Sequence, residues 1–128
     1  MWTPAAAIAF CIVLALLGVF QLALAAGAPL GRFAWGGGQE RLSAPLRIGS
    51  LVSILIYAVF AVVIAQRAGL VALLPAPDVA SIGAWVIAGY MALGILMNAI
   101  SRSKLERLVM TPVALVLFAT SLVVALGL

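Results

Sequence analysis

Residues 27–47 have the sequence GAPLGRFAWGGGQERLSAPLR, and this polar, glycine-rich stretch separates two long apolar runs. It holds three of the chain's seven Lys and Arg residues. A basic segment between two apolar runs is typical of the turn of a membrane hairpin. The stretch therefore indicates a chain that crosses a bilayer, and the other apolar runs can be placed relative to it.

The composition points to lipid as the solvent. Of 128 residues, 67% are hydrophobic and only 8% are charged, whereas a soluble domain carries about 25% charged residues. The net charge of +4 comes from seven basic and three acidic residues, which are too few and too scattered to follow a phosphate backbone. We therefore expect the lipid bilayer, and not nucleic acid, as the partner.

Four apolar runs are each long enough to cross the hydrocarbon core, which requires about 20 helical residues. They cover residues 4–26, 48–65, 80–100 and 108–128, and none has an acidic or basic residue in its interior. We therefore predict an all-α fold, in which residues 1–128 form a single integral membrane domain built as a four-helix transmembrane bundle.

Candidate helix starts precede these runs. Thr3, Ser43 and Asp78 are candidate N-caps, because their side-chain oxygens can accept hydrogen bonds from the first free backbone N–H groups of a helix. Before the fourth run, Ser103 and Glu106 have the spacing of a capping box, in which each side chain bonds the backbone N–H of the other residue. We expect the capping box to account for Glu106.

The basic residues predict how the chain is threaded. In a four-span protein, loops 27–47 and 101–107 lie on the same side of the membrane, and six of the seven basic residues lie in them. Loops rich in Lys and Arg stay in the cytoplasm. We therefore predict that both loops are cytoplasmic and that the N-terminus and C-terminus are both extracytoplasmic.

With this threading, several polar residues lie toward the cytoplasmic side, and four of them form a candidate vestibule or ligand site. These four, called the vestibule residues below, are Gln21, Ser53, Asn98 and Trp35. One interpretation is hydrogen bonding between packed helices, which contributes about 0.6 kcal/mol per contact. The other interpretation is a shallow polar vestibule closed by loop 27–47.

The glycine run that follows Trp35 also has two interpretations. Gly36, Gly37 and Gly38 can form a flexible linker, since glycine loses the most conformational freedom when it is ordered. Alternatively, they allow the backbone to approach a ligand, a lipid head group or loop 101–107 closely. A plain turn requires only one or two such residues, so the run calls for an explanation.

Catalytic chemistry has little support in the sequence. The chain has no histidine and only one cysteine, Cys11. These counts exclude a Ser-His-Asp triad, a Cys-His dyad, a disulfide within the chain and a thiolate metal cluster. We therefore expect no catalytic, cofactor-binding or metal-binding residues, no cofactor and no enzymatic activity.

Two motifs carry a resemblance. The segments GAPLGRFAWGG (27–37) and NAISRSKLER (98–107) together resemble a group of small, uncharacterised four-span bacterial membrane proteins. The resemblance implies a multi-pass protein of the bacterial plasma (inner) membrane, and it implies no particular activity.

Three functional hypotheses follow from the sequence. The first is a non-enzymatic structural or accessory subunit, which associates with a membrane partner protein or with further copies of itself. The second is a small transporter or channel with a polar cytoplasmic vestibule, which would have to be oligomeric because a compact four-helix bundle fills its own centre. The third is a lipid-head-group binder or membrane enzyme that contacts phosphates through Arg32, Arg41 and Arg47.

Overall fold

The computed structural model describes residues 1–128, apart from the side chain of Pro77. Within these residues lie four long helices and two short 3₁₀ turns: α1 (Thr3–Ala25), η1 (Gly31–Phe33), η2 (Trp35–Gly37), α2 (Ala44–Arg67), α3 (Pro77–Ala99) and α4 (Lys104–Leu126). Each of the four long helices is long and apolar enough to cross a membrane. The predicted all-α fold is confirmed, and the four helices indicate a multi-pass integral membrane protein.

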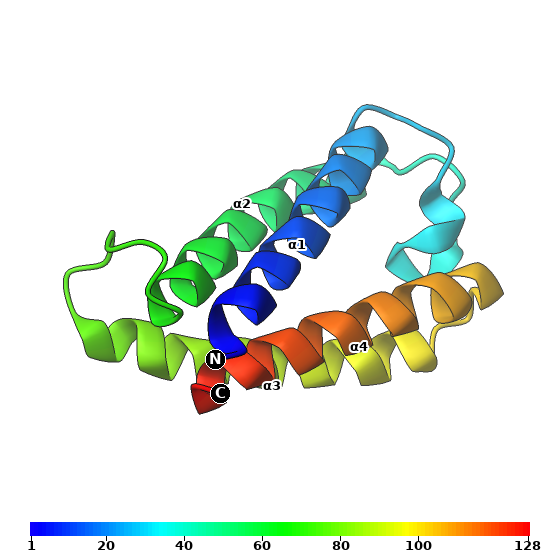
Figure 1. Ribbon diagram of the computed structural model, residues 1–128. Coiled ribbons are helices and arrows are strands. Elements are labelled where there is room, and N and C mark those ends of the chain that lie inside the picture. Colours follow the sequence, from blue (N-terminus) through cyan, green and yellow to red (C-terminus); the bar gives the residue numbers. More distant parts are fainter.

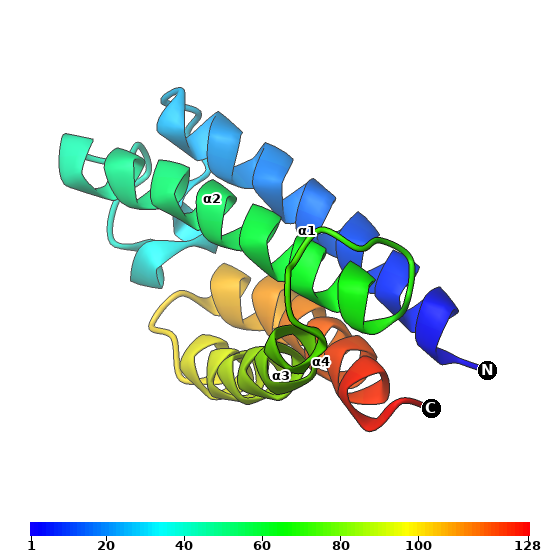
Figure 2. The ribbon, with the colours of Figure 1, turned by 90° about the vertical axis from the view of Figure 1, so that its left-hand side faces the viewer.

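The helices pair into two hairpins that lie in separate layers (Figures 1 and 2). α1 packs along α2, and α3 packs along α4. The N-terminus and C-terminus meet at one end of the molecule, where the backbone N–H of Trp2 donates to the carbonyl of Leu128 (2.9 Å). We call this end the terminal end. The opposite end holds segments 26–43 and 100–103, and we call it the loop end.

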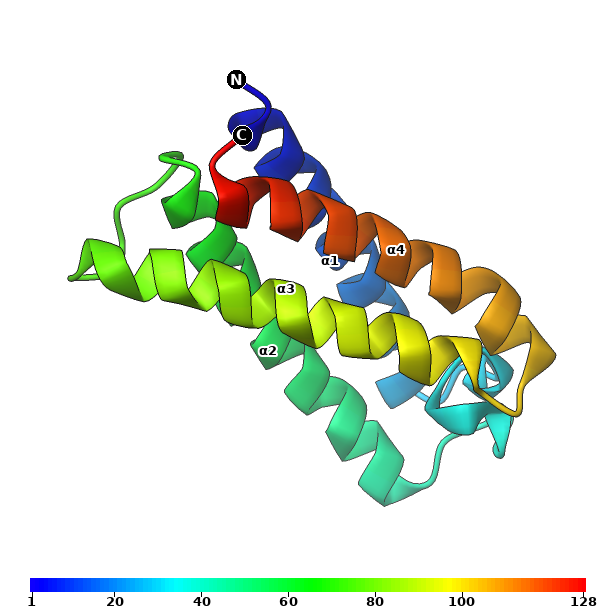
Figure 3. The same ribbon diagram turned by 90° about the horizontal axis from the view of Figure 1, so that it is seen from below.

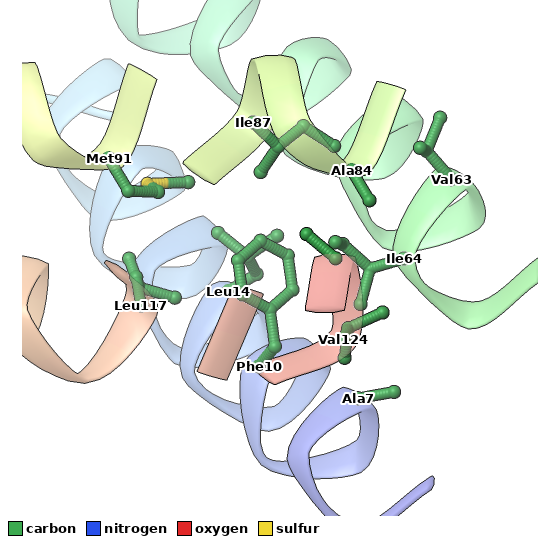
Figure 4. Packing of buried hydrophobic residues seen from close by; sticks show 11 residues of the cluster. Ala7, Phe10, Leu14, Val63, Ile64, Ala84, Ile87, Met91, Leu117 and Val124 are labelled. Carbon is green, nitrogen blue, oxygen red and sulfur yellow. The ribbon is translucent and has the colours of Figure 1, made fainter. Parts of the chain in front are cut away.

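The hydrophobic core fills the terminal half of the bundle (Figure 4). Phe10, Ile64 and Val124 are fully buried there and come from three different helices. Small residues let the hairpins approach closely, as is usual for helices packed in lipid. At Gly83 of α3, for example, a Cβ would lie only 2.8 Å from Cγ1 of Val63 in α2.

Toward the loop end the hairpins diverge, and the η1–η2 segment lies between them (Figures 1 and 3). A second, smaller cluster of Leu24, Ala34 and Leu42 holds this segment against the hairpin of α1 and α2. Gly31 permits the tight fold of the segment, because a Cβ at this position would overlap the backbone carbonyl of Gln39.

The outward faces of the helices are apolar, as a lipid solvent requires. Leu16, Val19, Leu55 and Ile82 are large apolar side chains that are each more than 60% exposed. Soluble monomers rarely expose an apolar surface of this extent. The exposed surface of the molecule is therefore suited to acyl chains.

The helix starts differ in part from the predicted ones. Ser103 is the N-cap of α4, and its hydroxyl accepts a hydrogen bond from the backbone N–H of Glu106 (3.3 Å). Ser43 occupies the N-cap position of α2, but its side chain makes no capping bond. The predictions for Thr3 and Asp78 were wrong, since both residues lie inside their helices.

All four helices begin before the apolar runs that predicted them, and the difference is largest, four residues, for two of them. α2 starts at Ala44 and α4 starts at Lys104, whereas the runs start at residues 48 and 108. A helix needs apolar residues where it meets lipid, but its first turn can be polar and still be helical. As a consequence, Glu106 lies in the first turn of α4 and not in a loop.

Candidate functional site

A cavity of about 450 Å³ lies between the two hairpins in the loop half of the molecule. All four long helices and the η1–η2 segment contribute side chains to its wall. Most of the wall is apolar: it includes Leu17, Phe20, Met91, Leu93, Met97, Met110, Val113 and Leu117. The expectation that the bundle fills its own centre was therefore wrong for this half, because the hairpins diverge there.

The four vestibule residues all line this cavity. Gln21 belongs to α1, Ser53 to α2 and Asn98 to α3, and Trp35 lies in η2. The sequence placed them at a similar level of the membrane, and the structure places them around the same space. The predicted covering by loop 27–47 is also seen, since Phe33, Ala34 and Trp35 line the cavity.

Gln21 carries an unused hydrogen-bond acceptor. Its Nε2 donates to the Tyr57 hydroxyl across the hairpin of α1 and α2 (3.2 Å). The residue is only 9% exposed, and its Oε1 is buried without a partner. A buried amide oxygen without a hydrogen bond is costly. This oxygen is therefore a candidate contact for a bound molecule.

Ser53 and Asn98 do not form bonds between helices. The Ser53 hydroxyl donates to the carbonyl of Gly49 (2.9 Å), and Asn98 Nδ2 donates to the carbonyl of Gly94 (2.8 Å). Both acceptors lie one turn earlier in the same helix. Helix-to-helix hydrogen bonding thus explains Gln21 but not these two residues.

Trp35 anchors the segment that covers the cavity. Its indole Nε1 donates to the Ser50 hydroxyl in α2 (3.2 Å). Its ring lies against Gly49, where a Cβ would be 2.9 Å from the ring atom Cη2. The backbone of Trp35 has φ +53°, a left-handed conformation that costs about 1–3 kcal/mol for a residue other than glycine. The contacts of the indole ring with α2 compensate for this strain.

The glycine run lies against the loop before α4. A Cβ at Gly37 would overlap the Ser103 side chain, and Gly37 has φ +72°. The Ser103 hydroxyl donates to the carbonyl of Arg32, so the same residue caps α4 and holds the η1–η2 segment. Of the alternatives that the sequence left open, close approach to loop 101–107 is observed at Gly37. Gly36 has φ +76°, which also favours glycine.

Glu106 is a cavity residue that sequence reasoning assigned to another role. It lines the cavity and is only 8% exposed. The capping box forms only in part: Glu106 donates its backbone N–H to Ser103, but the backbone N–H of Ser103 donates to the Ser101 hydroxyl (3.1 Å). The Glu106 carboxylate is therefore not used in capping.

A signal in the sequence could have placed Glu106 in the cavity. Met110, Val113 and Leu117 follow it at intervals of four, three and four residues, which puts all four on one helical face. That face lines the cavity. The signal was missed because the capping box was taken to account for Glu106.

The three arginines proposed to contact lipid phosphates do not line the cavity. Arg47 donates from Nε to the carbonyl of Leu42 (2.9 Å). The Arg32 guanidinium lies 5.6 Å from the centre of the Phe33 ring. Arg41 is exposed. Arg47 thus stabilises the loop itself, and Arg32 and Arg41 remain exposed at the loop end.

The cavity is open on the side of α3. Tyr90, Leu93 and Met97 line it, yet they are 52%, 55% and 58% exposed. Their spacing puts them on one face of α3, and the Tyr90 ring packs edge-on against Phe60 of α2 (5.3 Å between ring centroids). α2 diverges from α3 toward the loop end (Figure 3). An opening in this position connects the cavity with the acyl-chain region of a surrounding bilayer.

The arrangement can therefore hold a molecule, with hydrogen-bonding groups at the loop end and apolar side chains further in. Neither a protein-family model, nor a curated protein, nor a solved structure matches this chain.

Proposed function

We propose that this membrane protein acts by binding and not by catalysis. Its cavity takes up a lipophilic molecule with a polar end from the bilayer, through the opening between α2 and α3. The observation that carries the proposal is the cavity itself, which is enclosed by all four helices and is open beside three half-exposed residues of α3.

The distribution of polar groups along the cavity supports an amphipathic ligand. Gln21, Asn98 and Glu106 lie within about one turn of the loop-end termini of their helices. Leu17 and Leu117 line the deeper part. Glu106 and Leu117 are eleven residues apart, which corresponds to about 16 Å along α4 at 1.5 Å per residue. A molecule with a polar end and an apolar chain matches this length and polarity.

The orientation that we propose for the chain in the membrane rests on its basic residues. With the loop end in the cytoplasm, as the basic residues favour, the polar end of the ligand lies near the cytoplasmic interface. One chain encloses the cavity, so binding requires no second copy. This activity suits an accessory subunit that holds a lipophilic compound beside a partner protein.

The test fills the cavity from its α3 wall. At Gly94, a Cβ would meet nothing within 4 Å, and the residue lines the cavity. We expect Gly94→Leu to occupy the space and abolish binding. Gly89→Leu is the matched control, because Gly89 also has open space around it but does not line the cavity.

The readout uses Trp35, which lines the cavity, after the other two tryptophans are replaced (Trp2→Phe, Trp85→Phe). A neutral dodecyl amphiphile with a nitroxide head group is added to protein in nanodiscs of zwitterionic lipid. We expect saturable quenching of Trp35 in the wild-type background and in Gly89→Leu, and only non-saturable quenching in Gly94→Leu. Equal quenching in both glycine variants would contradict the proposal.

A further inference from the structure

The hydrogen-bond donors and acceptors of the cavity are used unequally. Four polar hydrogens on the cavity wall already donate within the protein. They are the Trp35 N–H, the Ser53 hydroxyl hydrogen and one N–H each of Gln21 and Asn98. The Tyr57 and Tyr90 hydroxyl hydrogens and the second N–H of each amide remain as donors. The acceptors are largely free, and Gln21 Oε1 is buried without any partner.

Glu106 adds a negative charge to this set. Among the described residues that line the cavity, it is the one charged residue. The neighbouring Arg107 does not neutralise it, because its Nη1 donates to the carbonyl of Ser101 (2.6 Å). No Lys or Arg of the described residues forms an ion pair with the Glu106 carboxylate.

Aromatic side chains complete the environment. Trp35, Tyr57 and Tyr90 line the same cavity, and the faces of aromatic rings attract cations. A cation placed beside the unpaired Glu106 carboxylate gains a charge-assisted hydrogen bond. The free acceptors, the unpaired negative charge and the aromatic rings all favour the same kind of ligand.

We infer that the molecule bound in the cavity is a lipophilic amine in its ammonium form. Its N–H groups donate to the Glu106 carboxylate, and its apolar part extends toward Leu17 and Leu117. This inference rests on the proposed function and specifies the class of its ligand.

Competition at the cavity tests the inference. The neutral nitroxide amphiphile quenches Trp35 as above, and unlabelled dodecylamine, dodecanol or dodecanoate is then titrated in to restore the emission. We expect dodecylamine to act at a concentration at least about tenfold below that of dodecanol, as one charge-assisted hydrogen bond allows. Dodecanoate is expected to be the weakest competitor, because its charge repels that of Glu106.

Glu106→Gln separates the charge from the shape of the cavity. We expect this variant to lose the preference for the amine, measured as the ratio of the dodecylamine and dodecanol concentrations that restore half of the variant's own quenched emission. The competitors partition into the nanodisc to different extents, but these differences are the same for both proteins. The change in amine preference from wild type to variant is therefore independent of partitioning. Glu40→Gln is the matched control, since it removes an equal charge from an exposed position outside the cavity.

The outcomes distinguish the two proposals. Loss of nitroxide quenching from the wild-type protein counts against the proposed function. Saturable quenching with equal potencies of dodecylamine and dodecanol overturns only the inference about the amine. An amine preference that persists in Glu106→Gln, or that disappears in Glu40→Gln, also overturns it.

Discussion

The two ends of this bundle are built from the same four helices, yet they are packed in opposite ways. At the terminal end, Phe10, Ile64 and Val124 interlock and leave almost no exposed area (Figure 4). At the loop end, the hairpins diverge around a cavity of about 450 Å³. The comparison separates a half that supplies stability from a half that supplies a binding space.

The difference has a physical origin in residue size and in the connecting segments. Ala7 and Ala84 are fully buried, and Gly83 touches Val63, so backbones approach closely at the terminal end. At the loop end, the η1–η2 segment lies between the hairpins and keeps them apart (Figure 1). Close packing in lipid depends on small residues at the contact, and a folded segment placed between two hairpins prevents that contact.

The largest effect is expected from removing the centre of the terminal core. Phe10→Ala should lower the free energy of unfolding by about 3–5 kcal/mol, because it leaves a cavity among buried side chains. Ile12→Ala is the control on the same helix, since Ile12 is 56% exposed and faces lipid. Thermal unfolding in detergent measures the stability of both variants. Similar losses for the two variants would show that Phe10 is not part of a packed core.

An identical substitution on α3 compares the two ends directly. Gly83→Leu places a side chain against Val63 and should destabilise the protein by about 1–3 kcal/mol through overpacking. Gly94→Leu extends into the cavity and should be neutral or stabilising by up to about 1 kcal/mol, as leucine is the better helix former. Unfolding midpoints of the two variants give the comparison. Equal destabilisation would mean that the loop end is packed as tightly as the terminal end.

The smallest loss of stability is expected from weakening the attachment of the η1–η2 segment, which covers the cavity. Ser103→Ala removes the N-cap of α4 and the bond to the carbonyl of Arg32, and should cost about 1 kcal/mol. Hydrogen exchange should also increase in segment 31–37. Ser43→Ala is the control, because Ser43 occupies an N-cap position without a capping bond. Unchanged exchange in Ser103→Ala would show that the segment is held by other contacts, such as the Trp35 ring on Gly49.

Much of the fold could be predicted from the sequence. The four apolar runs determine four helices, because a backbone in lipid must satisfy its hydrogen bonds internally. Polar groups in a membrane span avoid lipid, so Gln21, Ser53 and Asn98 stand out within or beside these runs. In the structure, all three line one cavity. Composition and periodicity carry this information locally, so no tertiary contact is needed to obtain it.

Other features were decided by tertiary structure alone. The sequence presents Glu106 as part of a capping box, but a hydrogen bond from Ser103 to Ser101 frees its carboxylate, and the divergence of the hairpins opens a space beside it. Likewise, Gly37 lies against Ser103, which is far away in the sequence, so only the tertiary structure shows why this position requires glycine. Whether the centre of a bundle is filled depends on how far apart its hairpins sit. That distance is set by contacts between segments that no local pattern records.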